Sequence, residues 1–193
     1  MQKRKGKALV WLRNDLRTSD QQSLYLATKN HEQIIAYYSF DPAQYASTKW
    51  WFKKTEVFRA QFLIETITAL QKDLADHNIS LIIEQLSPHS GLPDWITKLG
   101  ITDLYYQKEW TIEEQEEEEK VLRCLSSSIN IHSHYDQFLF HPEDIPMEID
   151  QLPEVFTAFR KKCEKYSSVR PCLPSLPTLE GEGHCYLGKL CGL

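Results

Sequence analysis

Short apolar runs alternate with longer amphipathic stretches along this chain of 193 residues. The runs are rich in β-branched and aromatic residues, and each is short and apolar enough for a strand of a parallel sheet covered on both faces. Such strands alternating with helices are typical of βαβ units. We therefore predict an α/β fold with a doubly wound sheet of about five parallel strands. They are Ala8–Leu12, Ile34–Ser39, Ile79–Glu84, Leu104–Gln107 and Ile129–His132.

The clearest helical pattern spans Thr55–Asp76. Its apolar residues recur at spacings of three and four, and we expect this stripe to face the sheet. The stripe consists of Phe58, Phe62, Leu63, Ile67, Leu70 and Leu74.

Capping signals predict a second helix over Thr111–Leu125. Thr111 has the position of an N-cap and Glu114 that of its capping-box partner. Acidic residues crowd the first turns, and we interpret the run Glu113–Glu119 as a solvated helix face. Further helices are predicted over 21–29, with Asp20 as the cap, and over 91–99 and 154–166.

The sequence changes character after residue 170. Pro171, Pro174 and Pro177 are followed by four glycines, a composition typical of linkers. We predict one α/β domain over 1–170 and a Pro/Gly-rich linker or tail over 171–193.

Composition and charge narrow the class of protein. Hydrophobic residues make up 41% and charged residues 25%, as in soluble globular proteins. The net charge of −5 disfavours a domain that grips a phosphate backbone by itself. No apolar run approaches a membrane span and no secretory signal is present, so we expect a cytoplasmic protein with no membrane contact. The five cysteines form no C-x-x-C motif, which favours free thiols.

The loop after the first predicted strand is the first candidate site. It reads Arg13-Asn14-Asp15-Leu16-Arg17 and lacks the glycines of a dinucleotide-binding turn. Ligands of open α/β sheets bind beyond the carboxyl ends of the strands, where this loop lies. Two interpretations stay open: a ligand-binding edge, or an Arg–Asp network that ties the loop to its neighbours.

Lys108 and Glu109 follow the fourth predicted strand at the same edge. A carboxylate there can accept hydrogen bonds from a ring amide or amino group of a ligand. Alternatively, Glu109 is a helix-capping acid. His132, His134 and His141 have no ligand partners at a convincing spacing, and no nucleophile motif occurs, so we predict neither a metal site nor catalytic residues.

Three sequence blocks resemble the DNA photolyase and cryptochrome family. Val10-Trp11-Leu12-Arg13-Asn14-Asp15-Leu16-Arg17 with Asp20 resembles the family's opening motif. Phe40-Asp41-Pro42, with the block from Phe52 to Leu63, is similar to the DASH-type cryptochromes. The stretch from Leu152 to Lys161 is similar to the end of their N-terminal domain.

The resemblance implies an N-terminal domain of Rossmann-like topology that holds an antenna chromophore, a methenyltetrahydrofolate or, in some branches, a deazaflavin. A larger helical domain follows in the family, where it binds FAD and lesion-bearing DNA and carries the carbon–carbon lyase activity. This chain stops at residue 193. We therefore expect FAD, DNA and repair activity only through a helical domain supplied by another chain.

The resemblance also implies the site residues. Glu109 matches the family's antenna-contacting acid, with Lys108 beside it, and Phe40 and Asp41 match the loop that lies against the antenna. The function predicted is a light-harvesting domain of a DASH-type cryptochrome or photolyase. The alternative is a stand-alone nucleotide-binding or interaction domain that forms a homo-oligomer through its exposed interdomain face, supplied by Phe138, Leu139, Phe140, Phe156 and Phe159.

Overall fold

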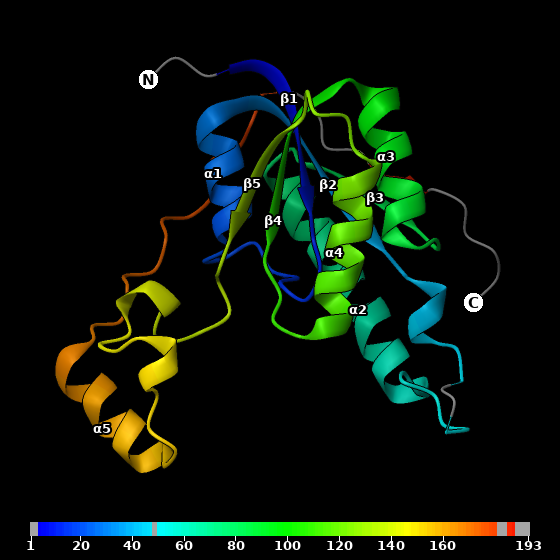
Figure 1. Ribbon diagram of the computed structural model, residues 1–193. Helices are drawn as coiled ribbons and strands as arrows, with labels where there is room; N and C mark the ends of the chain where they lie inside the picture. Colours follow the sequence, from blue (N-terminus) through cyan, green and yellow to red (C-terminus); the bar gives the residue numbers. More distant parts are fainter. Residues whose placement is uncertain (1–3, 48–49, 181–184, 188–193) are drawn as a thin grey trace.

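A parallel sheet with helices on both faces forms the body of the protein (Figure 1). The computed structural model describes residues 4–47, 50–180 and 185–187. Within these residues the strand order is β5-β4-β1-β2-β3-β6, and all pairs are parallel. The strands are β1 (Arg4–Trp11), β2 (His31–Ser39), β3 (Ser80–Glu84), β4 (Ile101–Gln107), β5 (Asn130–His134) and β6 (Cys185–Leu187).

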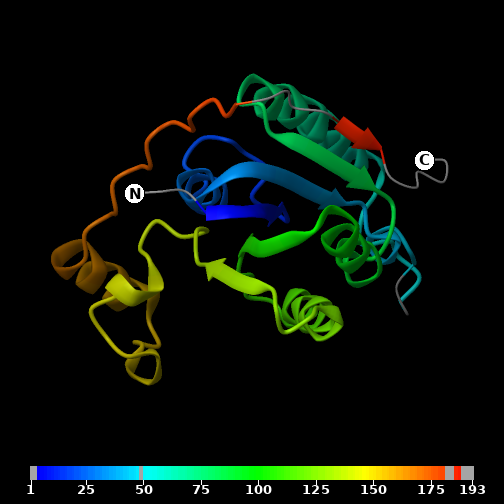
Figure 2. The ribbon, with the colours of Figure 1, turned by 90° about the horizontal axis from the view of Figure 1, so that it is seen from above.

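The helices divide between the two faces of the sheet (Figure 2). Two of them, α1 (Gln22–Asn30) and α2 (Val57–Asp76), cover one face, and α3 (Pro88–Leu99) and α4 (Ile112–Cys124) cover the other. The last helix, α5 (Phe156–Tyr166), lies in a lobe to one side of the sheet. The predicted doubly wound α/β fold is confirmed, and the first five strands are the five that the sequence predicts.

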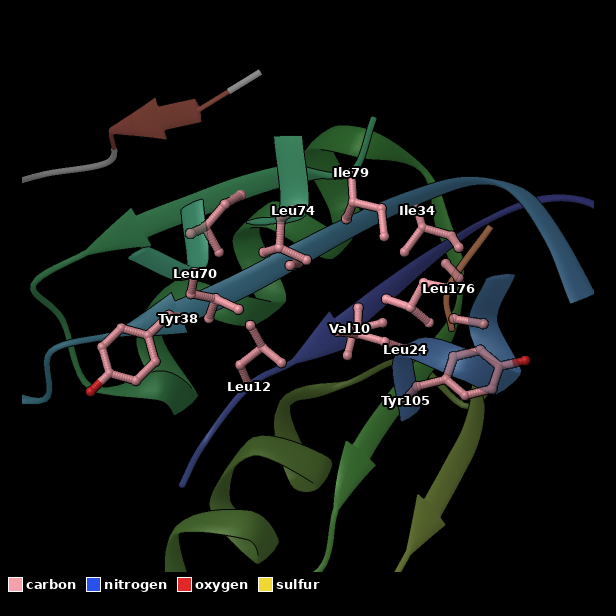
Figure 3. Packing of buried hydrophobic residues seen from close by; sticks show 14 of the residues in the cluster. Val10, Leu12, Leu24, Ile34, Tyr38, Leu70, Leu74, Ile79, Tyr105 and Leu176 are labelled. Carbon is pink, nitrogen blue, oxygen red and sulfur yellow. The ribbon is translucent and has the colours of Figure 1, made fainter. Parts of the chain in front are cut away.

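One core lies between the sheet and the α1–α2 layer. Val10 and Ile34 of the strands, and Leu12 directly after β1, meet Leu70 and Leu74 of α2 there, all nearly inaccessible to solvent (Figure 3). These residues alternate along each strand with the ones that face α3 and α4, as a sheet buried on both faces requires. The second core contains Leu9, Trp11, Tyr37, Leu104 and Tyr106.

The apolar stripe of α2 reaches the sheet only along its later turns. Ile67, Leu70 and Leu74 are buried as predicted, but Phe58 and Phe62 are 87% and 64% exposed. A helix of 20 residues is about 30 Å long, whereas a strand of five residues spans about 17 Å. The first turns of α2 therefore project beyond the carboxyl edge of the sheet, and the expectation that Phe58 and Phe62 face it was wrong.

One predicted cap residue is wrong, and a second has the predicted position without a side-chain hydrogen bond to the backbone. Gln21, not Asp20, is the N-cap of α1, and its side chain accepts from the Leu24 N–H. Asp20 has φ 51° and its carboxylate accepts from the Leu173 N–H at 2.8 Å instead. Thr111 is the N-cap residue of α4, but its hydroxyl donates to the Glu114 carboxylate at 2.7 Å.

The stretch after α5 runs back along the domain. Leu176 and Leu179 are buried in the α1–α2 core, although the surrounding sequence has the composition of a linker. The Leu179 N–H donates to the His77 carbonyl at 3.0 Å, and the Asn78 side chain donates to the Leu179 carbonyl at 2.7 Å. Residues 176–179 thus contribute to the core of the α/β domain.

Candidate functional site

A cavity of about 400 Å³ opens at the carboxyl edge of the sheet. The ends of β1 and β2, the first turns of α2 and the first turns of α4 surround it. Aromatic side chains and charged side chains of both signs share its lining. They include Trp11, Tyr38, Phe40 and Tyr45 among the aromatic residues, Arg13, Lys54, Arg59 and Lys120 among the cations, and Asp41, Glu113, Glu114, Glu116 and Glu117 among the acids.

Phe40 and Asp41, both predicted as site residues, line this cavity. Phe40 follows β2 directly and is only 5% exposed; its ring packs edge-on against Tyr38, with centroids 5.0 Å apart. The Asp41 Oδ1 atom accepts from the Ala43 N–H at 3.0 Å and from the Ser87 hydroxyl at 3.1 Å. Each residue is thus held in place by the fold, independently of any ligand.

The cations of the cavity differ in their partners. Lys54 pairs with Glu113 at 2.5 Å and Lys120 with Glu117 at 3.7 Å. No hydrogen bond or ion pair joins the Arg59 guanidinium to another of the described residues. Arg59 lies near the Tyr45 hydroxyl, where burial raises the tyrosine pKa and the guanidinium charge opposes that rise. Arg59 is therefore the cavity cation with the greatest freedom to bind an anion.

Glu109 lies behind the cavity and is only 4% exposed. Its Oε2 atom accepts from the Gln137 side chain, and its Oε1 atom lies 3.3 Å from the Asn14 amide and 3.4 Å from the Gln107 amide. Burial raises the pKa of this carboxyl, while the hydrogen bond from Gln137 lowers it. Protein groups thus already occupy both carboxylate oxygens.

Asn14 connects the Glu109 cluster with the cavity. Its Nδ2 atom contacts Glu109 Oε1 at 3.3 Å and Glu114 Oε1 at 3.2 Å, and Asn14 and Glu114 both line the cavity. Lys108 points elsewhere, since its Nζ atom lies 5.2 Å from the centre of the Tyr135 ring. Of the four predicted site residues, Phe40 and Asp41 lie in the cavity lining. Glu109 contacts the lining residue Asn14, and Lys108 lies outside the cavity.

The loop after β1 is an internal network of hydrogen bonds. Arg13, whose side chain is 8% exposed, pairs with Glu118 at 3.1 Å and lies over the Trp11 ring at 4.7 Å. The buried Asp15 carboxylate accepts from the Arg13 N–H at 2.8 Å and from the Gln21 amide at 2.6 Å. Of the two interpretations left open for the Arg–Asp residues, this geometry corresponds to the network that ties the loop down.

The three histidines of the sequence analysis lie in different surroundings. His141 Nδ1 accepts from the Glu143 N–H at 3.3 Å. His132 Nε2 lies 2.9 Å from the Asp103 carboxylate. Burial lowers the pKa of His134 to about 4. Within the described ranges, no three His, Cys, Asp or Glu side chains gather as a metal ion would require. None of the helices described is long and apolar enough to cross a membrane.

Sequence reasoning missed Arg59 and Asn14 as parts of the site. Arg59 lies one turn before Leu63, and both line the cavity. The i, i+4 spacing was a usable signal, but only the length of α2 relative to β3 reveals that this turn overhangs the sheet edge. Asn14 lies within the recognised loop, yet its role depends on a contact between residues far apart in sequence.

Comparison with known proteins agrees with this architecture. The family model described as DNA photolyase matches residues 8–179. The chain is 34% identical over 168 residues to the cryptochrome DASH of Gloeobacter violaceus, a match that covers 86% of this chain and 34% of the relative. It therefore spans about a third of the length of that curated relative.

Solved structures show the same relationship. The cryptochrome of Synechocystis sp. PCC6803 superposes with a TM-score of 0.86 at 33% identity, over 95% of this chain and 38% of that one. An archaeal photolyase from Sulfolobus tokodaii, solved with two FAD molecules, shares the fold with a TM-score of 0.73 at 19% identity, over 93% of this chain and 38% of that one. The chain belongs to the DNA photolyase family and corresponds to its N-terminal α/β domain, close to the DASH cryptochromes.

Proposed function

We propose that this chain is a light-harvesting domain and that the cavity at the carboxyl edge of its sheet binds an antenna chromophore. The observation that carries the proposal is the cavity itself. Aromatic side chains line it, and the Arg59 guanidinium in its lining makes no hydrogen bond or ion pair with another described residue. When bound, the chromophore would absorb light and pass its excitation on.

The residues present fit a flat, anionic chromophore. A volume of about 400 Å³ lies within the range of roughly 300–1,000 Å³ that small-molecule sites occupy. Phe40 and Tyr45 offer aromatic surface for stacking. Arg59 and Lys54 can hold a carboxylate or phosphate group. A methenyltetrahydrofolate satisfies these requirements and is our first candidate, with a deazaflavin as the second.

Glu109 acts on this site through Asn14. The Glu109 carboxylate accepts a hydrogen bond from the Asn14 side-chain amide. This bond fixes the orientation of that amide relative to the cavity. Asp41 and Phe40 contact the chromophore directly, and Lys108, lying over Tyr135, contributes only at the edge of the loop. Glu109 is thereby a positioning residue rather than a direct contact.

Repair chemistry belongs, on this proposal, to a helical domain outside these 193 residues. We infer that FAD and DNA bind to that domain, and that the α/β domain contributes light absorption to it. The exposed Phe138 and Phe156 offer surface for such a partner. We place the protein in the cytoplasm, as the sequence predicts.

The exposure of Phe138 and Phe156 also favours the alternative function. In that case the chain is a nucleotide-binding or interaction domain without an antenna, and these side chains lie in a homo-oligomer. The two functions differ in whether the isolated chain binds a chromophore.

Absorption and fluorescence titrations with methenyltetrahydrofolate, deazaflavin and FAD test the proposal. We expect saturable binding of the folate or the deazaflavin. The variant Glu109→Gln should keep its fold and bind about tenfold more weakly, because its new amide donor faces Asn14 and turns that side chain around. Binding of none of the three, or of FAD alone, would contradict the proposal. Unchanged affinity in Glu109→Gln would remove Glu109 from the site.

A further inference from the structure

Large apolar side chains gather on the surface where α2 begins. Trp51 is 94% exposed, Phe52 59%, Val57 71%, Phe58 87% and Phe62 64%. Phe58 and Phe62 are one turn apart on α2 and so share a side of the helix. We call these five residues the aromatic surface. Monomeric proteins rarely expose contiguous apolar patches of this kind unless they bind something.

The backbone of the aromatic surface adds a second observation. Trp51 has φ 68°, in the left-handed region that a bulky side chain rarely adopts. Such a conformation costs on the order of 1–3 kcal/mol and is concentrated at functional sites. In this chain it goes with a tryptophan side chain that is almost wholly in solvent.

Positive and negative side chains lie on different elements around the aromatic surface. Lys53, Lys54 and Arg59 lie among the aromatic residues, and the solvent side of α4 carries Glu113, Glu116 and Glu119. The ion pair between Lys54 and Glu113, at 2.5 Å, joins the basic part to the acidic part. A basic aromatic area and an acidic helix face thus lie side by side across one cavity mouth.

We infer that this surface binds a second copy of the chain about a two-fold axis that passes near the Lys54–Glu113 pair. Two-fold symmetry opposes each patch with its own copy in reversed orientation. The basic aromatic part of one copy then meets the acidic α4 face of the other, twice over. Tryptophan, phenylalanine and arginine are also the residues enriched in the centre of protein interfaces.

The same charges argue against a nucleic acid as the occupant. Aromatic residues with lysines are typical of single-strand binding, but there the groove is positive throughout. On this chain the exposed Glu113, Glu116 and Glu119 of α4 adjoin the basic part through the Lys54–Glu113 pair, so positive charge does not extend across the whole surface. A protein surface carrying both signs fits the observations better.

Sedimentation of the purified chain over a range of concentrations tests the inference. We expect a reversible monomer–dimer equilibrium. Phe58→Asp should raise the dimer dissociation constant by about 30-fold, as for a residue in the centre of an interface. Val169→Asp is the matched control, because Val169 is 53% exposed and lies outside the aromatic surface; it should leave the equilibrium unchanged. Phe156→Asp tests the alternative interface and should also have no effect.

Charge reversal makes the test independent of folding defects. Lys53→Glu and Glu116→Lys should each weaken the dimer, and an equimolar mixture of the two variants should restore it, because the mixed dimer opposes unlike charges at both positions. A monomer at all concentrations, a dimer broken by Phe156→Asp but not by Phe58→Asp, or a mixture that fails to recover would each overturn the inference. Because Lys54 and Arg59 line both the cavity and the proposed interface, the chromophore titrations are made on the Phe58→Asp variant as well as on the native chain, which separates binding from dimerisation.

Discussion

Two polar regions lie side by side at the carboxyl edge of the sheet, and they use their charged groups in opposite ways. Around Glu109, both carboxylate oxygens are bonded to side-chain amides and the group is 4% exposed. In the adjacent cavity, Arg59 has no ion pair or hydrogen bond with another described residue, and aromatic rings stand near it. A buried carboxylate whose two oxygens are both hydrogen-bonded by the protein stabilises a fold, whereas charge left available in a concave site is suited to a ligand.

The comparison therefore separates stability from binding. Mutations in the Glu109 cluster should lower the free energy of unfolding, with binding affected through Asn14. Mutation of Arg59, the cavity cation without an ion pair among the described residues, should change affinity and leave stability intact. A residue of one region whose mutation changes the property assigned to the other region would weaken this separation of stability from binding.

The largest effect expected is on stability. Glu109→Ala removes the acceptor of the buried Gln107 amide and of the more exposed Asn14 and Gln137 amides, and it empties a side-chain position that is 4% exposed. We expect it to lower the free energy of unfolding by about 3 kcal/mol in urea denaturation. Glu119→Ala, at a position whose side chain is 64% exposed, is the control and should cost less than about 0.5 kcal/mol. Equal stability of the two variants would show that the Glu109 cluster is not a structural element.

Arg59→Ala should do the opposite of Glu109→Ala: it should lower chromophore affinity and leave stability unchanged. Loss of a charged hydrogen-bond donor to an anionic chromophore should weaken binding by about 30-fold. The free energy of unfolding should stay within about 0.5 kcal/mol of the native chain, since no described residue depends on the guanidinium. Arg160→Ala on α5, an arginine whose side chain is 54% exposed, should alter neither quantity. A large loss of stability in Arg59→Ala would contradict the comparison.

The protonation of His134 adds a pH dependence to the buried region. Burial lowers its pKa to about 4 in the folded chain, against about 6.5 when unfolded. The unfolded state therefore takes up the proton first as pH falls. The stability that neutral His134 contributes is complete above pH 6.5 and is lost between there and about pH 4.

His134→Gln should remove that part of the pH dependence. Comparing unfolding at pH 7 and pH 5, we expect the native chain to lose about 1 kcal/mol more than the variant, a figure reduced for the partial exposure of the side chain. The raised pKa values of Asp15 and Glu109 act in the opposite direction and are present in both chains, so they cancel in the difference. An equal pH dependence in the two proteins would show that His134 is solvated.

Lys108→Ala should have the smallest effect. Its ammonium lies 5.2 Å from the centre of the Tyr135 ring, outside the cavity, and an exposed contact of this kind contributes about 0.5 kcal/mol. We expect chromophore affinity to change by no more than about twofold. A loss as large as that of Arg59→Ala would move the binding site to the loop after β4.

The sequence predicted β1 to β4 as apolar runs between clear breaks and the region of β5, but it missed β6, which lies in the stretch predicted as a Pro/Gly-rich linker or tail. Phe40 and Asp41 follow directly from the end of β2 and line the cavity, and their contact with a chromophore stays a prediction. The sequence placed Phe58 and Phe62 wrongly because periodicity describes the face of a helix, not how far the helix extends past its sheet. Arg59 and the Asn14–Glu109 contact depend on distances between separate elements, and one-dimensional patterns do not contain those distances.

A crystal structure of the chain grown with methenyltetrahydrofolate would test the central claim most directly. The account predicts the ring system against Phe40 in the cavity, an anionic group of the ligand on Arg59, and the hydrogen bonds of Glu109 to Gln137 and Asn14 intact. A ligand seated on Glu109 with Gln137 displaced, or one bound away from the cavity, would contradict it.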